Sequence, residues 1–219
     1  MPFHNFKCAL VLVLLASGGF VLQGQTRTSP TDCGNGSSAR VERDGKRVVY
    51  RGEYCNAEYE FRVLLPDGVA AVAGFPRSSG FNIYLTHPAS TEWGGDFPWS
   101  RLWVIASQGH PCGDQESPDR VTQWDREDSE RIGATELQLV QRTQTSLASM
   151  PAVDWIARRT DPNQGKVVYE AVAAKRADTG ICYVIGMASP ADRHEKDHEL
   201  FKAVLEGFRY VPLVHGENQ

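Results

Sequence analysis

The fold is decided by Lys166-Val-Val-Tyr-Glu-Ala-Val-Ala-Ala-Lys175, the turn Asp178-Thr-Gly180 and the run Ile181-Cys-Tyr-Val-Ile-Gly-Met-Ala188. Both runs are rich in β-branched and aromatic residues, which favour strands, and the aspartate and glycine between them are typical of a tight turn. Two more such runs precede them, Glu136–Thr145 and Ala152–Arg159. Consecutive strands joined by short turns predict an antiparallel sheet meander.

Shorter runs of the same character lie upstream. The segment that begins at Ser117 has the serine and following proline of a helix start, but it holds few apolar residues, so a helix and an exposed loop both remain open. We expect further strands, each bounded by glycine or proline, at Arg47–Tyr54, Tyr59–Leu65, Phe81–Thr86 and Leu102–Ala106.

The last element is predicted to be a C-terminal amphipathic helix. Ser189-Pro190 would open it, and Gly207 and Pro212 would close it. A sheet meander packed by such a helix predicts an α+β fold. The apolar residues that recur at helical spacing are Leu200, Phe201, Val204, Leu205 and Phe208.

The composition is that of one ordinary globular domain. The chain has 219 residues, of which 41% are hydrophobic and 23% are charged. Its formal net charge is −4 and its lysines and arginines form no cluster, which argues against nucleic-acid binding and membrane-surface binding. The sequence also lacks a phosphate loop, a dinucleotide fingerprint and a G-x-S-x-G motif. We therefore expect no cofactor and favour a non-catalytic role.

The N-terminus is typical of a secretory signal peptide. Lys7 precedes the apolar run Cys8–Ala16, and small residues follow up to Gly24. The run is shorter than the roughly 20 apolar residues of a membrane-spanning helix, so cleavage is preferred over a permanent anchor. We expect a secreted or periplasmic protein with no membrane span after cleavage. The predicted organisation is a signal peptide (1–24), a flexible arm (25–45), one domain (46–212) and a tail (213–219).

Four cysteines follow the leader: Cys33, Cys55, Cys112 and Cys182. Export would place them in an oxidising compartment, where two disulfides are the default interpretation. Sequence alone leaves three pairings possible. The preferred one joins Cys33 to Cys55 and Cys112 to Cys182. A nucleophilic Cys112 beside His110 is the less favoured alternative.

Residues 55 to 210, taken in this order of elements, resemble the PsbP-like fold, named for an extrinsic subunit of photosystem II. The resemblance implies an α/β/α sandwich, with helices on both faces of the sheet. It also implies a non-enzymatic accessory or envelope protein, and it brings no catalytic residues with it. The segments that carry it are Leu147-Ala-Ser-Met-Pro-Ala152, Tyr169-Glu-Ala-Val, Gly180-Ile-Cys-Tyr-Val-Ile-Gly and Phe201-Lys-Ala-Val-Leu-Glu-Gly-Phe-Arg209.

The sharpest motif is His194-Glu195-Lys196-Asp197-His198, which matches the H-E-x-x-H zinc signature. One helical turn separates the two imidazoles, so both could bind one zinc ion while Glu195 activates a bound water. The charges of Lys196 and Asp197 argue against a buried zinc helix. We therefore favour a solvated first helical turn and keep a small zinc-dependent hydrolase as the alternative. Its candidate third ligands lie on the same helix or on the tail, at Glu199, Glu206, His215 and Glu217.

Aromatic residues gather between Trp93 and Trp103, in a segment that departs from the PsbP-like pattern. Trp103 lies inside a predicted strand and is assigned to the core. Trp93, Phe97 and Trp99, which lie near glycine and proline residues, are candidates for a binding surface. The sequence thus predicts a binding or accessory module whose partner is an unidentified protein or small-molecule ligand.

Overall fold

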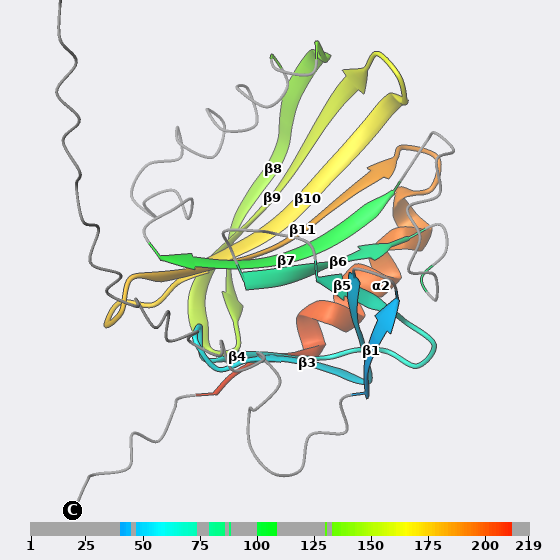
Figure 1. Ribbon diagram of the computed structural model, residues 1–219. Coiled ribbons are helices and arrows are strands. Elements are labelled where there is room, and N and C mark those ends of the chain that lie inside the picture. Colours follow the sequence, from blue (N-terminus) through cyan, green and yellow to red (C-terminus); the bar gives the residue numbers. More distant parts are fainter. Residues whose placement is uncertain are drawn as a thin grey trace, which may run out of the picture.

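The structure is a computed structural model, and it describes residues 40–44, 47–73, 79–85, 88, 100–108, 130 and 133–211. Its main feature is a large, strongly twisted antiparallel sheet, with one helix and a small second sheet beneath it in the view of Figure 1. No helix in these residues has both the length and the apolar character needed to cross a membrane.

The large sheet contains nine strands among the described residues, and every neighbouring pair in it is antiparallel. In spatial order the strands are β1 (Arg40–Asp44), β2 (Arg47–Arg51), β5 (Ala71–Ala73), β6 (Ser79–Tyr84), β7 (Arg101–Gln108), β11 (Ile181–Pro190), β10 (Gly165–Lys175), β9 (Met150–Asp161) and β8 (Thr135–Leu147).

The four longest strands, β8 to β11, form a meander at one end of this sheet, in agreement with the pairing predicted from the sequence. Ala148 and Ser149, both with positive φ (46° and 69°), make the turn between β8 and β9. Gly165 and Gly180 have φ of 75° and 70° in the next two turns, where the left-handed conformation favours glycine. These tight turns fix the register of the strands that carry the site described below.

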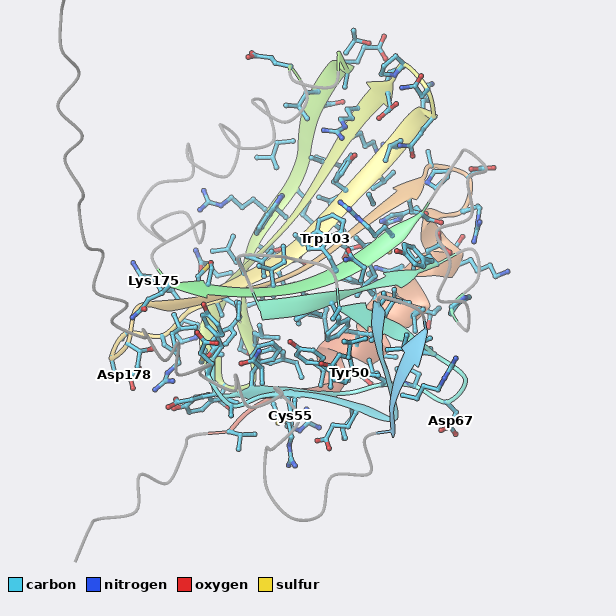
Figure 2. All side chains as sticks on the ribbon, viewed as in Figure 1. Tyr50, Cys55, Asp67, Trp103, Lys175 and Asp178 are labelled. Atoms are coloured by element: carbon cyan, nitrogen blue, oxygen red, sulfur yellow. The ribbon has the colours of Figure 1, made fainter. Side chains whose placement is uncertain are left out.

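A three-stranded sheet and the helix lie on one face of the large sheet. The small sheet consists of β12 (Phe208–Tyr210), β4 (Phe61–Leu64) and β3 (Glu53–Asn56), and the helix is α2 (His194–Gly207). Both sheets and the helix contribute to one apolar core between these layers, and Tyr50 of β2 points into it (Figure 2). The largest fully buried side chains of this core are Tyr183, Phe61, Phe81, Phe201 and Phe208.

The helix ends where it meets the small sheet. A Cβ added to Gly207 would lie 2.3 Å from the carbonyl oxygen of Leu64 in β4, so glycine is required for this close approach. β12 begins at the next residue and pairs with β4. The C-terminal end of α2 is thereby fixed against the small sheet, and the helix also contacts β11.

The opposite face of the large sheet carries Trp103, which alternates along β7 with the core residues Leu102 and Val104. Trp103 is 6% exposed, and its ring lies against Gly186 of β11, where an added Cβ would come within 2.4 Å of the indole. The assignment of Trp103 to the core is confirmed (Figure 2).

The predicted fold class is wrong. An α+β fold, with a meander packed by helices on both faces as an α/β/α sandwich, does not describe this structure, because the described residues are mostly β and α2 is the one helix among their elements. The reason lies in Arg47–Tyr54, predicted as one strand. The chain turns at Gly52, whose φ is 75°, so that β2 joins the large sheet and β3 the small one. A second sheet therefore lies beside α2 on the face where the sequence predicts helices alone.

Two boundaries also differ from the prediction. Ser189 and Pro190, predicted to open the helix, belong to β11 and pair with β10, and the helix begins at His194. Residues 40–44, predicted as part of a flexible arm, form β1, which pairs with β2. The predicted signal peptide, the helix or loop from Ser117 and the C-terminal tail lie outside the described residues.

Candidate functional site

Two histidines one turn apart on α2 face the large sheet. His194 opens the helix and His198 follows four residues later, which puts both side chains on one side of the helix. Their ring centroids are 5.9 Å apart. Phe201 and Val204 continue the same side and are fully buried. The histidines therefore lie at the half-buried end of the core-facing stripe of α2.

Asp197 anchors the first turn of α2 to the sheet. It is 4% exposed, and its carboxylate accepts hydrogen bonds from Ser189 Oγ of β11 at 2.5 Å and from the Arg193 guanidinium at 3.1 Å. Glu195 and Lys196 are exposed. The solvated first turn that the sequence predicts is therefore found at Glu195 and Lys196 but not at Asp197, whose charge is compensated inside the protein.

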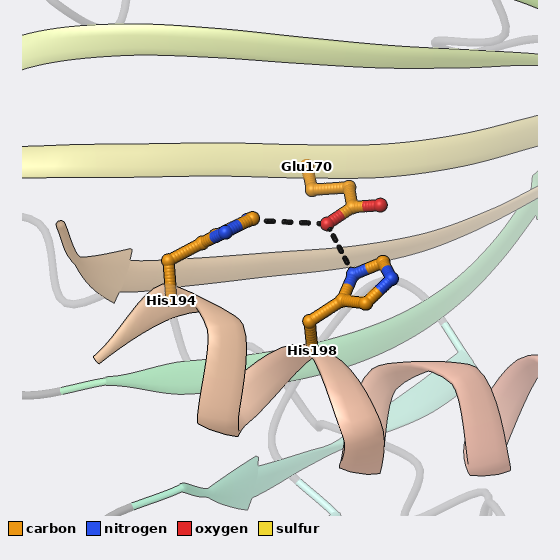
Figure 3. A group of neighbouring side chains, drawn as sticks. All are labelled: Glu170, His194 and His198. Atoms are coloured by element: carbon orange, nitrogen blue, oxygen red, sulfur yellow. Dashed lines mark hydrogen bonds and ion pairs between the residues drawn. The ribbon is translucent and has the colours of Figure 1, made fainter. Parts of the chain in front are cut away.

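The third residue of the site is Glu170, which projects from the middle of β10 toward both histidines (Figure 3). It is 3% exposed. Its Oε2 lies 3.2 Å from His194 Nε2 and 2.8 Å from His198 Nδ1, so one carboxylate oxygen contacts both imidazoles. The potential ligand atoms of the three side chains lie within 4.8 Å of one another. We call Glu170, His194 and His198 the Glu–His–His cluster.

Two carboxyl groups beside the helix have different electrostatic surroundings. Burial alone would raise the pKa of Glu170, but its hydrogen bonds with His194 and His198 outweigh this effect and hold the pKa below its usual value. On the neighbouring strand β9, burial and then the charge of Glu170 raise the pKa of Asp154 to about 6, while His198 acts in the opposite direction. The charge of Glu170 is therefore stabilised by the two histidines, whereas the charge of Asp154 is opposed by burial and by Glu170.

A pocket of about 480 Å³ borders the cluster, between α2 and strands β8 to β10. Acidic and imidazole groups line it together with apolar side chains of the core, and Lys202 and Arg209 add positive charge. A second pocket, of about 510 Å³, is lined by His194 and by the basic residues Arg158 and Lys166 among others. The cluster thus borders two pockets. In the first, the acidic, imidazole and apolar groups include Asp154, Glu170, His198, Val172, Phe201 and Leu205.

The motif in the sequence locates only part of this cluster. His194 and His198 come together as an H-E-x-x-H motif predicts, whereas Glu195 is exposed and does not belong to the cluster. None of the expected third ligands belongs to it within the described residues. Glu199 pairs with Lys202 at 2.9 Å, Glu206 is exposed, and His215 and Glu217 lie outside the described residues.

Sequence reasoning missed Glu170 and Asp154. A signal was present, because Glu170 interrupts an otherwise apolar run and a buried acid requires a partner. The identity of that partner could not be read from the sequence. His194 and His198 are 24 and 28 residues away from Glu170 and are brought to it only when α2 packs on the sheet.

The remaining predicted site residues are only partly described. Trp93, Phe97 and Trp99 lie outside the described residues, as do Cys33 and Cys112. Cys55 and Cys182 are buried, with 3% and 2% exposure, and both are disulfide-bonded. The binding role of the three aromatic residues and the pairing of the cysteines stay predictions.

No protein-family profile and no curated protein matches the chain. Solved structures do resemble it. The solution structure of PsbP (CyanoP) from Synechocystis sp. PCC 6803 has a TM-score of 0.52 and 15% identity, covering 72% of this chain and 91% of that one. LpqN, involved in cell envelope biogenesis of Mycobacterium tuberculosis, has a TM-score of 0.48 and 11% identity, covering 69% of this chain and 83% of that one.

The Ran-binding protein Mog1p of Saccharomyces cerevisiae has a TM-score of 0.45 and 12% identity, covering 80% of this chain and 97% of that one. At such identities the likeness concerns the fold alone. The resemblance to the PsbP-like fold is confirmed at that level by the CyanoP structure.

Proposed function

We propose that this chain is an exported, non-catalytic binding or accessory module, and that it binds its ligand or partner in the pocket between α2 and strands β8 to β10. The observation that carries the proposal is the polar part of this pocket, where Asp154 and Glu170 lie beside His198. Asp154 Oδ1 is buried and has no hydrogen-bond partner among the described residues. Leaving a buried acceptor unpaired is costly, so this part of the pocket favours a group that donates a hydrogen bond or carries positive charge.

The size and lining of the pocket support a small ligand or one side chain of a partner protein. Its volume of about 480 Å³ falls within the roughly 300 to 1,000 Å³ of ordinary ligand pockets. Phe201 and Leu205 would supply apolar contact. Lys202 and Arg209 line the same pocket, so a ligand with a donor group and an acidic group would find a complement for each.

Export is proposed from the sequence, and the cysteines support it. The leader-like pattern of residues 1–24 is typical of a secreted or periplasmic protein. The disulfide-bonded state of Cys55 and Cys182 is characteristic of an oxidising compartment. The aromatic residues Trp93, Phe97 and Trp99 are proposed, from the sequence alone, as a further contact surface.

A zinc-dependent hydrolase is the weaker proposal. It requires Glu195 beside a water bound at His194 and His198. Glu195 is exposed instead, and Glu170 contacts both imidazoles. A peptidase assay on the zinc-loaded protein and on its Glu195→Gln variant separates the two proposals. The hydrolase requires activity that the variant lacks, whereas we expect no peptidase activity in either protein.

Nuclear magnetic resonance of the ¹⁵N-labelled mature protein tests the binding proposal. The probes are free amino acids, monosaccharides and short carboxylic acids, each added at millimolar concentration. We expect at least one of them to shift, saturably, the amide signals of Ser146, Asp154, Val172 and Leu205, which surround the pocket.

Two variants of α2 provide the control for this measurement. Leu205→Trp would fill the pocket from its half-buried position, whereas Lys196→Trp adds the same side chain on the exposed side of the helix. Binding should disappear in the first variant and persist in the second. The proposal fails if no probe produces a saturable shift, or if the shifts survive in Leu205→Trp.

A further inference from the structure

The Glu–His–His cluster has the composition and spacing of a metal site. It offers one carboxylate oxygen and two imidazole nitrogens, which are the donors that zinc and the neighbouring divalent transition metals bind. A tetrahedral ion with bonds of about 2.05 Å holds its ligand atoms about 3.3 Å apart. Glu170 Oε2 lies 3.2 Å from His194 Nε2 and 2.8 Å from His198 Nδ1. Small side-chain rotations would therefore admit an ion.

The charges at the site also favour a cation. Glu170 and Asp154 bring two carboxyl groups to the same pocket, where α2 packs over the sheet. A divalent ion would compensate both charges and would give the unpaired Oδ1 of Asp154 a positively charged neighbour.

The ligands come from elements that are already fixed in place. Glu170 belongs to β10, which pairs with β9 on one side and β11 on the other. The first turn of α2 is held to β11 by the hydrogen bond that Ser189 donates to Asp197. Ligands held in this way lose little freedom when an ion binds.

The position of the cluster leaves access for an ion. Its residues border both pockets, so an ion could enter from solvent and keep a coordination position for water or for a ligand. The half-buried histidines have side chains that are 22% and 32% exposed, while Glu170 closes the inner side. The arrangement thus has an open outer side and a fixed inner one.

We infer that Glu170, His194 and His198 form a binding site for a divalent transition-metal ion, in which Glu195 takes no part. The inference goes beyond the proposed function and does not depend on it, because the three ligands are present whether or not a ligand occupies the pocket. Failure of the nuclear magnetic resonance experiment above would leave the metal site standing, and absence of metal binding would leave the pocket.

Isothermal titration calorimetry tests the site with zinc chloride as the probe. The mature protein is first stripped with EDTA and dialysed, and zinc bound per chain is counted by native mass spectrometry. We expect one zinc ion per chain. Glu170→Gln and His198→Ala should each weaken binding by at least about 100-fold, because each removes a direct ligand. Glu195→Gln, the same chemical change next to His194, should leave the affinity unchanged.

Two checks keep the test independent of folding. Circular dichroism and the melting temperature show whether each variant keeps its structure, and His194→Ala provides a further ligand variant at a half-buried position if Glu170→Gln fails to fold. Cobalt(II) should give the visible absorption of a low-symmetry site in the wild type, and this absorption should be lost in His198→Ala. If zinc does not bind, or binds equally to the wild type and the ligand variants, the inference is overturned and the cluster only fastens α2 to the sheet.

Discussion

Among the described carboxyl groups, Asp154 has surroundings that clearly destabilise its ionised form. Burial and the neighbouring charge of Glu170 raise its pKa to about 6, whereas an aspartate in an unfolded chain titrates near about 3.9. The folded protein therefore holds this proton more tightly than the unfolded chain does. Protonation of Asp154 stabilises the fold, and the stabilisation is lost as the pH rises through about 6.

Asp154→Asn should consequently have a pH-dependent effect on stability. Asparagine carries no charge, so the free energy of unfolding of the variant relative to the wild type should be higher at pH 8 than at pH 4.5. The expected difference is roughly 1 kcal/mol, a value reduced for the partial exposure of the side chain. Urea unfolding at both pH values, with EDTA present, measures it. An identical relative stability at the two pH values would show that Asp154 has no raised pKa.

Arg176 joins parts of the chain that are far apart in sequence. Its side chain is 8% exposed, donates hydrogen bonds to Glu60 and Asp178, and lies 4.3 Å from the ring centre of Tyr210. Tyr210 in turn donates to Glu60 at 3.0 Å. The guanidinium thus connects the end of β10 to the small sheet through partners on two other segments.

Arg176→Ala should cost about 3 kcal/mol of stability, because it leaves the largely buried carboxylate of Glu60 without its cation. Arg158→Ala removes an exposed arginine from β9 and should change stability by less than about 0.5 kcal/mol. Urea unfolding of the two variants tests the difference. Equal losses would contradict a structural role for the Arg176 contacts.

The strands of the meander and the C-terminal helix could be predicted from sequence because their signals are local. β-Branched runs between turn residues locate β8 to β11, and apolar spacing locates α2. The small sheet could not be predicted, since it depends on the turn at Gly52 and on β12, a strand of three residues that pairs with the sequence-distant β4. The fold class failed for this reason.

The same distinction between local signals and contacts of distant segments applies to the candidate site. The relation between His194 and His198 is local to one helix, so a motif could predict it. Glu170 lies on β10 and contacts the two histidines only because α2 packs against the sheet. No local sequence pattern predicts this contact. Asp197 shows the same limit: its partner Ser189 lies on β11, so the sequence predicts a solvated turn where the protein buries a charge.

The junction of α2 and β4 provides a test of packing between elements. Gly207→Ala should destabilise the protein by about 2 kcal/mol, because the added Cβ would lie 2.3 Å from Leu64 O and the layers must separate. Gly133→Ala is the comparison, since nothing lies within 4 Å of its added Cβ and only its φ of 71° opposes the change, at about 1 kcal/mol. Thermal unfolding of both variants measures the difference. If Gly207→Ala is as stable as the wild type, α2 does not pack on β4 as described.

The disulfide bonds of the cysteines affect the stability of the whole molecule. Cys55 lies in the small sheet and Cys182 in the large one, and both are disulfide-bonded. We expect peptide mapping without reduction to recover Cys33 joined to Cys55 and Cys112 joined to Cys182. Reduction should then lower stability by about 2 to 5 kcal/mol, as it does for disulfides of small exported domains. Recovery of Cys33 joined to Cys112 would overturn this pairing.

The protein is a twisted sheet with a helix and a second sheet packed on one face (Figure 1), and the buried carboxylate of Glu170 lies where α2 meets β10 (Figure 3). Burying such groups away from water is costly for the folded state. A binding role would explain why the protein keeps the carboxyl groups of Asp154 and Glu170 despite this cost, because a ligand or an ion could supply the positive charge that compensates them.

The crystal structure of the zinc-soaked protein, measured on both sides of the zinc absorption edge, tests most directly the metal site inferred between α2 and β10. We predict an anomalous peak between α2 and β10, about 2.0 to 2.2 Å from His194 Nε2, His198 Nδ1 and an oxygen of Glu170. Zinc found only on exposed side chains elsewhere, with Glu170 still hydrogen-bonded to both imidazoles, would contradict it.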